Sequence, residues 1–354
     1  MRPRAHGGSE HGMMLLAYAG SLTLSAQEAP HPLTPLSSRS THPLSASPSG
    51  ASVMRAVNDT SSVTPMTCGA LVYLHIGKTG GSSVTAHMKE ASKQANFSYY
   101  KVWWSSDGTT TPHELYNYTT DPHWVNFKKE VNSLAQPKAT VMLHHGVPGL
   151  SKYLWSAELL PMQQMLEAKG CELRLTTVVR EGSGRARSQF NYGFQNWPKR
   201  QSTGHPECAS MADGSDNPTD ECVCQFAADN SNIQTTYVNY GHLQSDSIWD
   251  KTVGTPNGDN PLGYLANGEE TTNARWAAKT TKFLEETSYL VGCTENLDSF
   301  GAALDAMLGV PASKMPSDNP TSLSVELSTT ARTECIDKAN VADTKVHDYF
   351  CGAA

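Results

Sequence analysis

Residues 71–83 read LVYLHIGKTGGSS, and this stretch decides how the rest of the chain is interpreted. A short apolar run changes into a loop of glycine and hydroxyl residues with one lysine, and a helical pattern follows over residues 84–94. A strand, a glycine loop and a helix in this order form a cradle for phosphate, because the first N–H groups of the helix point at the anion. We therefore predict that Lys78 and the residues after it bind a phosphate group.

The loop differs from that of ATP-binding proteins in the position of its glycines. The P-loop motif needs a further glycine before Gly77, at position 72, where this chain has Val72. Its glycines instead follow the lysine, at Gly80 and Gly81. A P-loop-type nucleotide kinase stays open as an alternative function, although the sequence offers neither this glycine nor a clear acidic ligand for Mg²⁺.

A second candidate for anion binding follows another apolar run. Residues 173–179 are short and rich in β-branched side chains, which is typical of a buried strand. The run ends in Arg180, and Arg185 and Ser188 follow in a segment that should be helical. Arginine recognises phosphate through paired, charge-assisted hydrogen bonds. Alternating strands and helices favour an α/β fold with a parallel sheet, whose carboxyl edge is where such loops belong.

These motifs resemble those of carbohydrate sulfotransferases that use PAPS (3′-phosphoadenosine-5′-phosphosulfate). The loop at residues 78–83 is similar to the 5′-phosphosulfate loop of that family, and residues 180–192 are similar to its 3′-phosphate motif. Gly77 and Gly182 stand where the family usually has proline. Residues 289–297 are similar to a Val-Gly-x-Thr-Glu strand and turn of that family, and the helical pattern that follows should end at Gly309. A further helix is expected at 155–168, and weaker landmarks lie at 232–235 and 340–349. The likeness covers roughly residues 70–350 and is closest to the heparan sulfate 2-O- and 6-O-type enzymes of the Golgi membrane.

The resemblance implies a fold and a set of roles. The fold would be a P-loop-like, three-layer α/β fold with a central parallel sheet flanked by helices and with loop insertions. Lys78 would stabilise charge on the leaving group, and no metal would be needed. The residues expected to hold PAPS are Lys78, Thr79, Gly80, Gly81, Ser82, Ser83, Arg180 and Ser188.

The resemblance also implies a histidine that takes the proton of the acceptor hydroxyl. His145 is the first candidate, because it ends an apolar run at 139–143 that should be a strand. A histidine titrates near neutral pH, which suits a general base. His144 is the second candidate and Glu90 the third. His75 lies inside the first expected strand and is more typical of a core residue.

The acceptor is expected to be a hydroxyl of a carbohydrate. The chain has 27 Lys and Arg against 34 Asp and Glu, a net charge of −7, which excludes nucleic acid as a bulk electrostatic partner. A non-catalytic secreted protein that retains the fold is a further alternative. The sugar, its hydroxyl and the oligomeric state are left open.

The N-terminal part and the cysteines favour the secretory pathway, with the Golgi lumen implied by the family. Residues 1–26 could form a signal or short anchor that associates with the membrane, and 27–66 a Pro/Ser/Thr-rich stem. The catalytic domain would span 67–354, with insertions at about 201–219 and 245–270. Sequons begin at Asn58, Asn96 and Asn117. The chain has eight cysteines, which favours disulfides, but the pairing stays open. Cys222 and Cys224 are spaced too closely for a common zinc site, so disulfides are expected there too.

Overall fold

The fold was analysed in a computed structural model of the whole chain. The structure describes residues 63–102, 121–134, 139–145, 154–196, 206–211, 217–239, 270–316 and 327–352. All of them belong to one compact unit, Ala51–Ala354. The expected leader at 1–26, the stem up to residue 62 and the insertion at 245–269 lie outside the described residues. Val63 and Met66, at the end of the expected stem, are buried in the core, so the folded part begins before residue 67.

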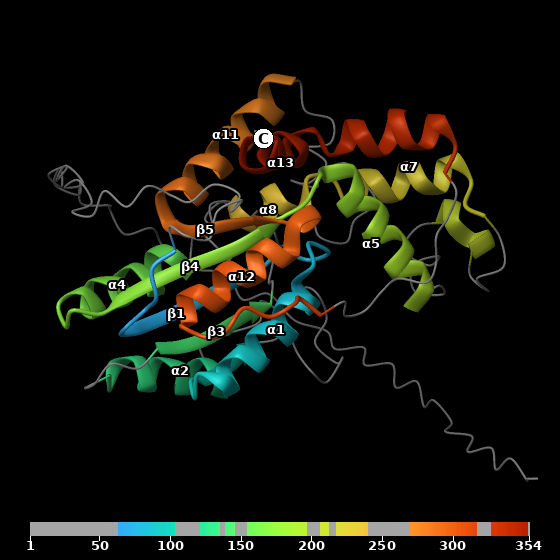
Figure 1. Cartoon of the computed structure of the whole chain (residues 1–354). Coiled ribbons are helices and arrows are strands. Elements are labelled where there is room, and N and C mark those ends of the chain that lie inside the picture. Colours follow the sequence, from blue (N-terminus) through green and yellow to red (C-terminus); the bar gives the residue numbers. More distant parts are fainter. Residues whose placement is uncertain are drawn as a thin grey trace, which may run out of the picture. The chain divides into compact units, whose positions relative to one another are not determined.

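Five strands form one sheet in the described part of the chain, in the order β2-β3-β1-β4-β5 (Figure 1). Every neighbouring pair is parallel. All seven residues of the central strand β1 are buried, as expected for an apolar run with helices on both faces. The strands are β1 Gly69–His75, β2 Ser98–Val102, β3 Ala139–His145, β4 Glu172–Val179 and β5 Ser288–Cys293.

Helices cover both faces of this sheet, as Figure 1 shows. On one face α1 (Gly81–Gln94) and α12 (Leu297–Leu308) pack on Leu71 and Tyr73 of β1. On the other face α2 (Pro122–Asn132) and α4 (Leu160–Glu167) pack on Val72 and Leu74. The same face beside β5 is covered by α8 (Ile233–Asn239), α11 (Glu270–Thr287) and α13 (Val341–Cys351). This arrangement confirms the expected α/β class with a central parallel sheet flanked by helices.

A smaller apolar cluster lies beside the sheet. It joins α5 (Gly182–Asn196) with α7 (Asp220–Asp229), and its aromatic centre is formed by Phe190, Phe194 and Phe226. Two short elements complete it, the 3₁₀-helix η4 (Pro206–Met211) and the π-helix η8 (Ala331–Asp337). The described part of the insertion expected at 201–219 is thus η4 and residues 217–219, which end at Thr219, the N-cap of α7.

Four disulfides connect the eight cysteines and fix pairings that the sequence left open. They are Cys68–Cys171, Cys208–Cys222, Cys224–Cys335 and Cys293–Cys351. The first joins the residues just before β1 and β4, and the second and third attach α7 to η4 and η8. Disulfides persist in oxidising compartments, so this chain fits a secreted or lumenal protein. Of the three sequons, Asn96 is described, and it is exposed after α1. None of the described helices has the length and apolar character needed to span a membrane.

The sequence located most of the elements that build the sheet. The expected strands at 70–76, 139–143, 173–179 and 289–293 correspond to β1, β3, β4 and β5. The predicted end of a helix at Gly309 is confirmed, since that glycine has φ 67° and closes α12. The helix expected at 155–168 begins instead as a π-helix, η3 (Trp155–Leu159), before α4. Edge strand β2 and helices α7, α8 and α13 were not predicted.

Gly182, where the resemblance expects proline, is explained by close packing. A Cβ there would lie 2.7 Å from the Asn340 carbonyl oxygen and 2.8 Å from Thr344 Oγ1. We expect Gly182→Ala to lower the free energy of unfolding by about 1–3 kcal/mol in urea titration, the usual cost of overpacking. Alanine is otherwise the better helix former by about 1 kcal/mol, so a stabilised variant would contradict this packing. In Gly170→Asn, no atom lies within 4 Å of the added Cβ, and asparagine is among the side chains that best tolerate the left-handed φ of 71°, so the loss should be smaller, about 1 kcal/mol or less.

Candidate functional site

The strand order makes the carboxyl ends of β1 and β4 a switch point of the sheet, and the region beyond these ends, around Lys78 and Arg180, is called the crevice. From β1 the chain continues to β2 on one side of the sheet, and from β4 it continues to β5 on the other. Ligands of open α/β sheets bind where neighbouring connections diverge in this way. The loop that follows β1 carries Lys78, and the residue that follows β4 is Arg180. Arg180 Nη1 donates a hydrogen bond of 3.3 Å to the Lys78 carbonyl oxygen, so the two predicted anion motifs meet.

Lys78 stands in this crevice in an unusual backbone conformation. Its φ is 67°, a left-handed value that few non-glycine residues adopt. Its ammonium lies 3.8 Å from the centroid of the Tyr192 ring on α5. Burial lowers the pKa of Lys78 to about 8, and the positive charges of Arg180 and Arg185 add to this effect. A half-buried lysine beside the positive charge of two arginines favours the binding of an anion.

The helix that follows Lys78 has an open N-terminus. Gly80, at the N-cap of α1, provides no side-chain cap, and the first turn contains no acidic residue. Its φ of 83° suits glycine, and Gly81 is required because a Cβ there would lie 1.8 Å from His75 Nε2. The close approach of α1 to β1 thus depends on Gly81. The N–H groups in the first turn of a helix favour an anion.

The N-terminus of α5 is already occupied. The Glu181 carboxylate accepts hydrogen bonds from the Ser183 N–H at 2.9 Å and the Gly184 N–H at 2.6 Å. Burial acts to raise the pKa of Glu181, but these N–H donors and Thr344 outweigh it and lower that pKa. The carboxylate is therefore ionised and caps the helix. The N-terminus of α5 is thus occupied by a carboxylate of the chain itself, whereas the first turn of α1 contains no acidic residue.

The hydroxyl residues of the loop have different surroundings. Thr79 is fully buried and its hydroxyl donates to the Ile76 carbonyl oxygen at 2.9 Å. Thr79 would therefore contact a ligand through its backbone N–H rather than the hydroxyl that the sequence suggested. Ser82 is half-buried at the start of α1, and Ser83 is buried beside it.

The backbone of Arg180 is held by the side chain of Gln234. The Gln234 amide accepts from the Arg180 N–H at 2.8 Å and donates to the Arg180 carbonyl oxygen at 2.7 Å. Gln234 is itself fixed by Asp343, whose carboxylate accepts from the N–H groups of Gln234 at 2.9 Å and Thr235 at 2.8 Å. Arg180 therefore leaves β4 with its backbone direction set by α8 and α13.

Arg185 is a structural partner of this network. Its side chain is 1 % exposed, lies 3.8 Å from Asp343 Oδ2 and donates to the Asn230 carbonyl oxygen at 2.9 Å. Burial raises the pKa of Asp343, and Arg185 together with the two backbone N–H donors opposes that rise. Arg185, Ser188 and Tyr192 have the i, i+3, i+7 spacing of one face of α5. Ser188 thus lies on the face of the helix that contacts Lys78.

The candidate bases lie at different distances from the crevice. His145 is the last residue of β3 and pairs in register with His75 of β1, so its backbone reaches the same carboxyl edge. His144 is one position earlier, opposite Leu74. Glu90 is exposed, pairs with Lys93 at 2.9 Å, and lies about 14 Å along α1 from Gly81. Backbone position therefore favours the histidines over Glu90. His75 is buried, as expected of a core residue.

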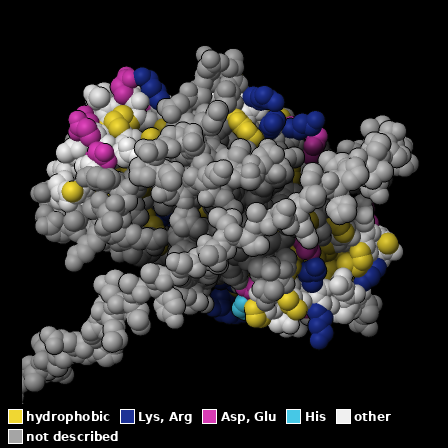
Figure 2. Space-filling view, turned by 180° about the vertical axis from the view of Figure 1, so that it is seen from behind, with side chains coloured by type: hydrophobic (Ala, Val, Ile, Leu, Met, Phe, Trp, Pro, Cys, Tyr) yellow, Lys and Arg dark blue, Asp and Glu magenta, His cyan; other side chains and the backbone are white. Residues whose placement is uncertain are grey.

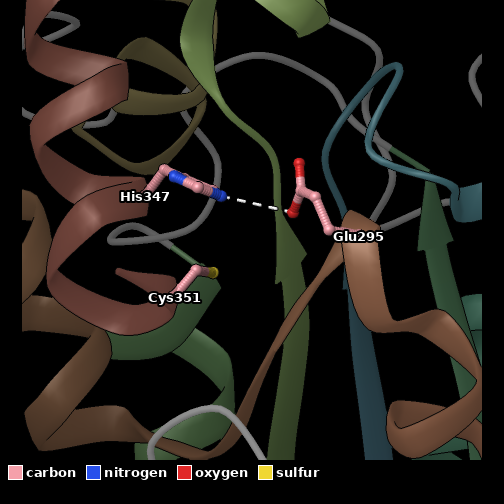
Figure 3. A group of neighbouring side chains, drawn as sticks. All are labelled: Glu295, His347 and Cys351. Atoms are coloured by element: carbon pink, nitrogen blue, oxygen red, sulfur yellow. Dashed lines mark hydrogen bonds and ion pairs between the residues drawn. The ribbon is translucent and has the colours of Figure 1, made fainter. Parts of the chain in front are cut away.

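A carboxylate and a histidine, Glu295 and His347, face one another after β5 (Figure 3), and the charge of Glu295 acts on Arg180. His347 Nε2 on α13 lies 3.2 Å from Glu295 Oε2 in the 3₁₀-turn η7 (Thr294–Asn296). The hydrogen bond to Glu295 raises the pKa of His347. Cys351 Sγ is close to both and would complete a set of metal ligands. Because this sulfur is bonded to Cys293, it is no thiolate, and only two ligands remain.

No protein-family model matches this chain, and no curated protein matches it either. The function therefore has to be argued from the geometry. The described side chains on the face shown in Figure 2 include basic residues close to acidic ones, in agreement with the moderate net charge of −7. The cationic group at Lys78 and Arg180 is a local feature of the crevice.

The sequence indicated residues that would face a ligand but not the residues that hold their backbone in place. Gln234 and Asp343 lay in stretches that were noted only as weak landmarks, with no role given. The role of these two residues depends on a hydrogen bond between them, and they are more than a hundred positions apart in the chain. The sequence did contain one sign of this network. Residues 232–236 are polar apart from Ile233, and polar side chains that are buried require hydrogen-bond partners.

We expect Gln234→Ala to lower the free energy of unfolding by about 1–3 kcal/mol in urea, because both backbone groups of Arg180 lose their partner. Gln234→Glu would turn an acceptor toward the Arg180 carbonyl oxygen and bury a carboxylate, so it should cost at least as much as Gln234→Ala. Gln225→Ala is the matched control, since Gln225 bonds only Asp229 on its own helix, and should cost about 0.5 kcal/mol or less. Equal losses in Gln234→Ala and Gln225→Ala would contradict the assigned role.

Proposed function

We propose that this protein is a PAPS-dependent sulfotransferase that transfers a sulfuryl group to a hydroxyl of a carbohydrate. The observation that carries the proposal is the meeting of Lys78 and Arg180, from two distant motifs, at the carboxyl edge of β1 and β4. A nucleotide with phosphates at both the 3′ and 5′ positions needs two such anion sites. The sequence resemblance assigns the 5′-phosphate to the loop and the 3′-phosphate to Arg180 and Ser188.

The chemistry of the donor set fits this nucleotide. The α1 N-terminus and Lys78 supply N–H and ammonium donors without an acidic neighbour in the first turn, and Arg180 supplies a guanidinium beside them. Glu181 caps α5 and Glu295 is paired with His347. The engagement of both carboxylates favours binding without a divalent cation over the Mg²⁺-dependent mode of a kinase. The parallel order β2-β3-β1-β4-β5, with a phosphate loop after the central strand, agrees with a P-loop-like fold.

Each residue would contribute a separate part of the reaction. PAPS supplies the activated sulfuryl group. Lys78 and the α1 N-terminus would offset negative charge that grows on the 5′-phosphate side, and such preorganised donors are a large source of rate enhancement. His145 would accept the proton from the attacking hydroxyl. The four disulfides agree with the lumen of the Golgi, where the enzymes it resembles act on glycans.

Nucleotide binding measured by calorimetry tests the assignment. We expect adenosine 3′,5′-bisphosphate to bind without metal and more tightly than adenosine 5′-monophosphate. Arg180→Ala should weaken the bisphosphate about 10- to 100-fold, the cost of losing charge-assisted hydrogen bonds, and should leave the monophosphate almost unchanged. Lys78→Ala should weaken both ligands.

The control is Arg275→Ala, which removes an exposed arginine of α11 and should change neither affinity. Preference for ATP with Mg²⁺ would transfer the protein to the kinase class. Binding of none of these nucleotides would support a non-catalytic protein that retains the fold. An equal loss of both ligands in Arg180→Ala would reject Arg180 as the 3′-phosphate residue.

The pKa of Lys78 predicts a pH dependence of binding. A protonated lysine favours an anion, and with a pKa of about 8 the free Lys78 loses its proton as pH rises through that value. Affinity for the bisphosphate should therefore fall about threefold to thirtyfold between about pH 7 and pH 9.5, measured by calorimetry in a series of buffers. Lys78→Arg should show a flatter profile, because arginine stays charged over this range. A flat profile in the unaltered protein would mean that Lys78 is not a ligand residue.

A further inference from the structure

Two contacts join the loop after β1 to the segment after β4, and the sequence resemblance assigns roles to Arg180 and Lys78 but none to Tyr192, the partner in the second contact. The first is the hydrogen bond from Arg180 to the Lys78 carbonyl oxygen. The second is the stacking of the Lys78 ammonium on Tyr192, 3.8 Å from the ring centroid. The backbone of Lys78 is left-handed, with φ 67°, and its long side chain extends to the Tyr192 ring.

We propose that Tyr192 is a positioning residue that holds the Lys78 ammonium, in its charged form, over the phosphate loop before a nucleotide binds. The face of a tyrosine ring attracts a cation, so the ring keeps the ammonium in place without neutralising it. A carboxylate in the same position would hold the lysine equally well but would repel the incoming phosphate. The stacked ring leaves the full positive charge available to the ligand.

The charges around Lys78 explain why such a partner is needed. Arg180 at the end of β4 and Arg185 on α5 both repel the ammonium, and burial disfavours its charge further. The nearby carboxylates are directed at the arginines: Glu295 acts on Arg180, and Asp343 acts on Arg185. The Tyr192 ring, 3.8 Å from the Lys78 ammonium, is a partner that stabilises this charge. Without the ring, the lysine should lose its proton more readily.

The position of Tyr192 on α5 gives the contact a second consequence. Ser188 precedes Tyr192 by one helical turn on the same face, and Arg180 precedes the first turn of α5. A stack between Lys78 and Tyr192 therefore sets the distance between the loop that should take the 5′-phosphate and the helix that should take the 3′-phosphate. This part of the inference rests on the proposed function.

The test compares Tyr192→Leu, which removes the ring, with Tyr192→Phe, which keeps it. The first measurement uses no nucleotide: lysines are labelled with acetic anhydride between about pH 6 and pH 10, and the rate at Lys78 is followed by mass spectrometry. In Tyr192→Leu the midpoint should move to lower pH and labelling near pH 7 should become about threefold to fivefold faster. That ratio corresponds to about 0.7–1.0 kcal/mol of lost stabilisation of the cation. Tyr192→Phe should match the unaltered protein.

The matched control is Tyr289→Leu, which removes a tyrosine ring that carries Arg174 at 4.1 Å elsewhere in the fold, and which should not change Lys78 labelling. The second measurement is the affinity for adenosine 3′,5′-bisphosphate, expected to fall about threefold to tenfold in Tyr192→Leu and to be restored in Tyr192→Phe. An unchanged labelling midpoint in Tyr192→Leu, or an equal change in Tyr192→Phe, overturns the proposal. The expected labelling shift in a protein that binds no nucleotide would support the contact and reject the proposed function.

Discussion

The parallel pairing of β1 with β4 is the constraint on which the remaining features of this protein depend. The two strands pair in register from Gly69 with Glu172 to Leu74 with Thr177. The disulfide between Cys68 and Cys171 joins their amino ends, and the Lys78 loop and Arg180 follow their carboxyl ends. A shift of register would exchange the faces of these strands and bury the wrong side chains. It would also separate two motifs that are about a hundred residues apart in the chain.

The polar network around Asp343 is unusual because it is buried and yet close to a surface site. Asp343, Arg185, Asn232 and Gln234 are each nearly inaccessible to water. Removing such groups from water is costly unless each finds partners, and here the partners are largely backbone N–H groups of neighbouring helices. The network therefore acts less as a source of stability than as a means of fixing direction. It defines where α8 and α13 meet and how Arg180 leaves β4.

The electrostatics of the crevice follow from where charges are paired and where they are not. An acidic chain with a net charge of −7 can still bind an anion if its carboxylates are engaged at the right places. Glu181 is used by the N-terminus of α5, Asp343 by Arg185, and Glu295 by His347. At the carboxyl ends of β1 and β4, the described groups then include Lys78 on the Tyr192 ring, Arg180, and the N-terminus of α1, which has no side-chain cap. Local pairing, rather than total charge, determines the sign of the site.

The sequence by itself determined the strands of the sheet centre, the glycine loop, the helix end at Gly309 and the residues that should face a phosphate. These are local properties: apolar runs, glycine conformations and the chemistry of lysine and arginine act within a few residues. Only the tertiary structure decided the disulfide pairing, the shielding of the Thr79 hydroxyl and the position of Tyr192 under Lys78. The same holds for the hydrogen bonds between Gln234 and the Arg180 backbone. The contacts of Tyr192 and Gln234 join segments that are far apart in the chain, and the burial of Thr79 depends on the packing around its loop. Burial and pairing are properties of neighbours in space, and no spacing along the sequence encodes them directly.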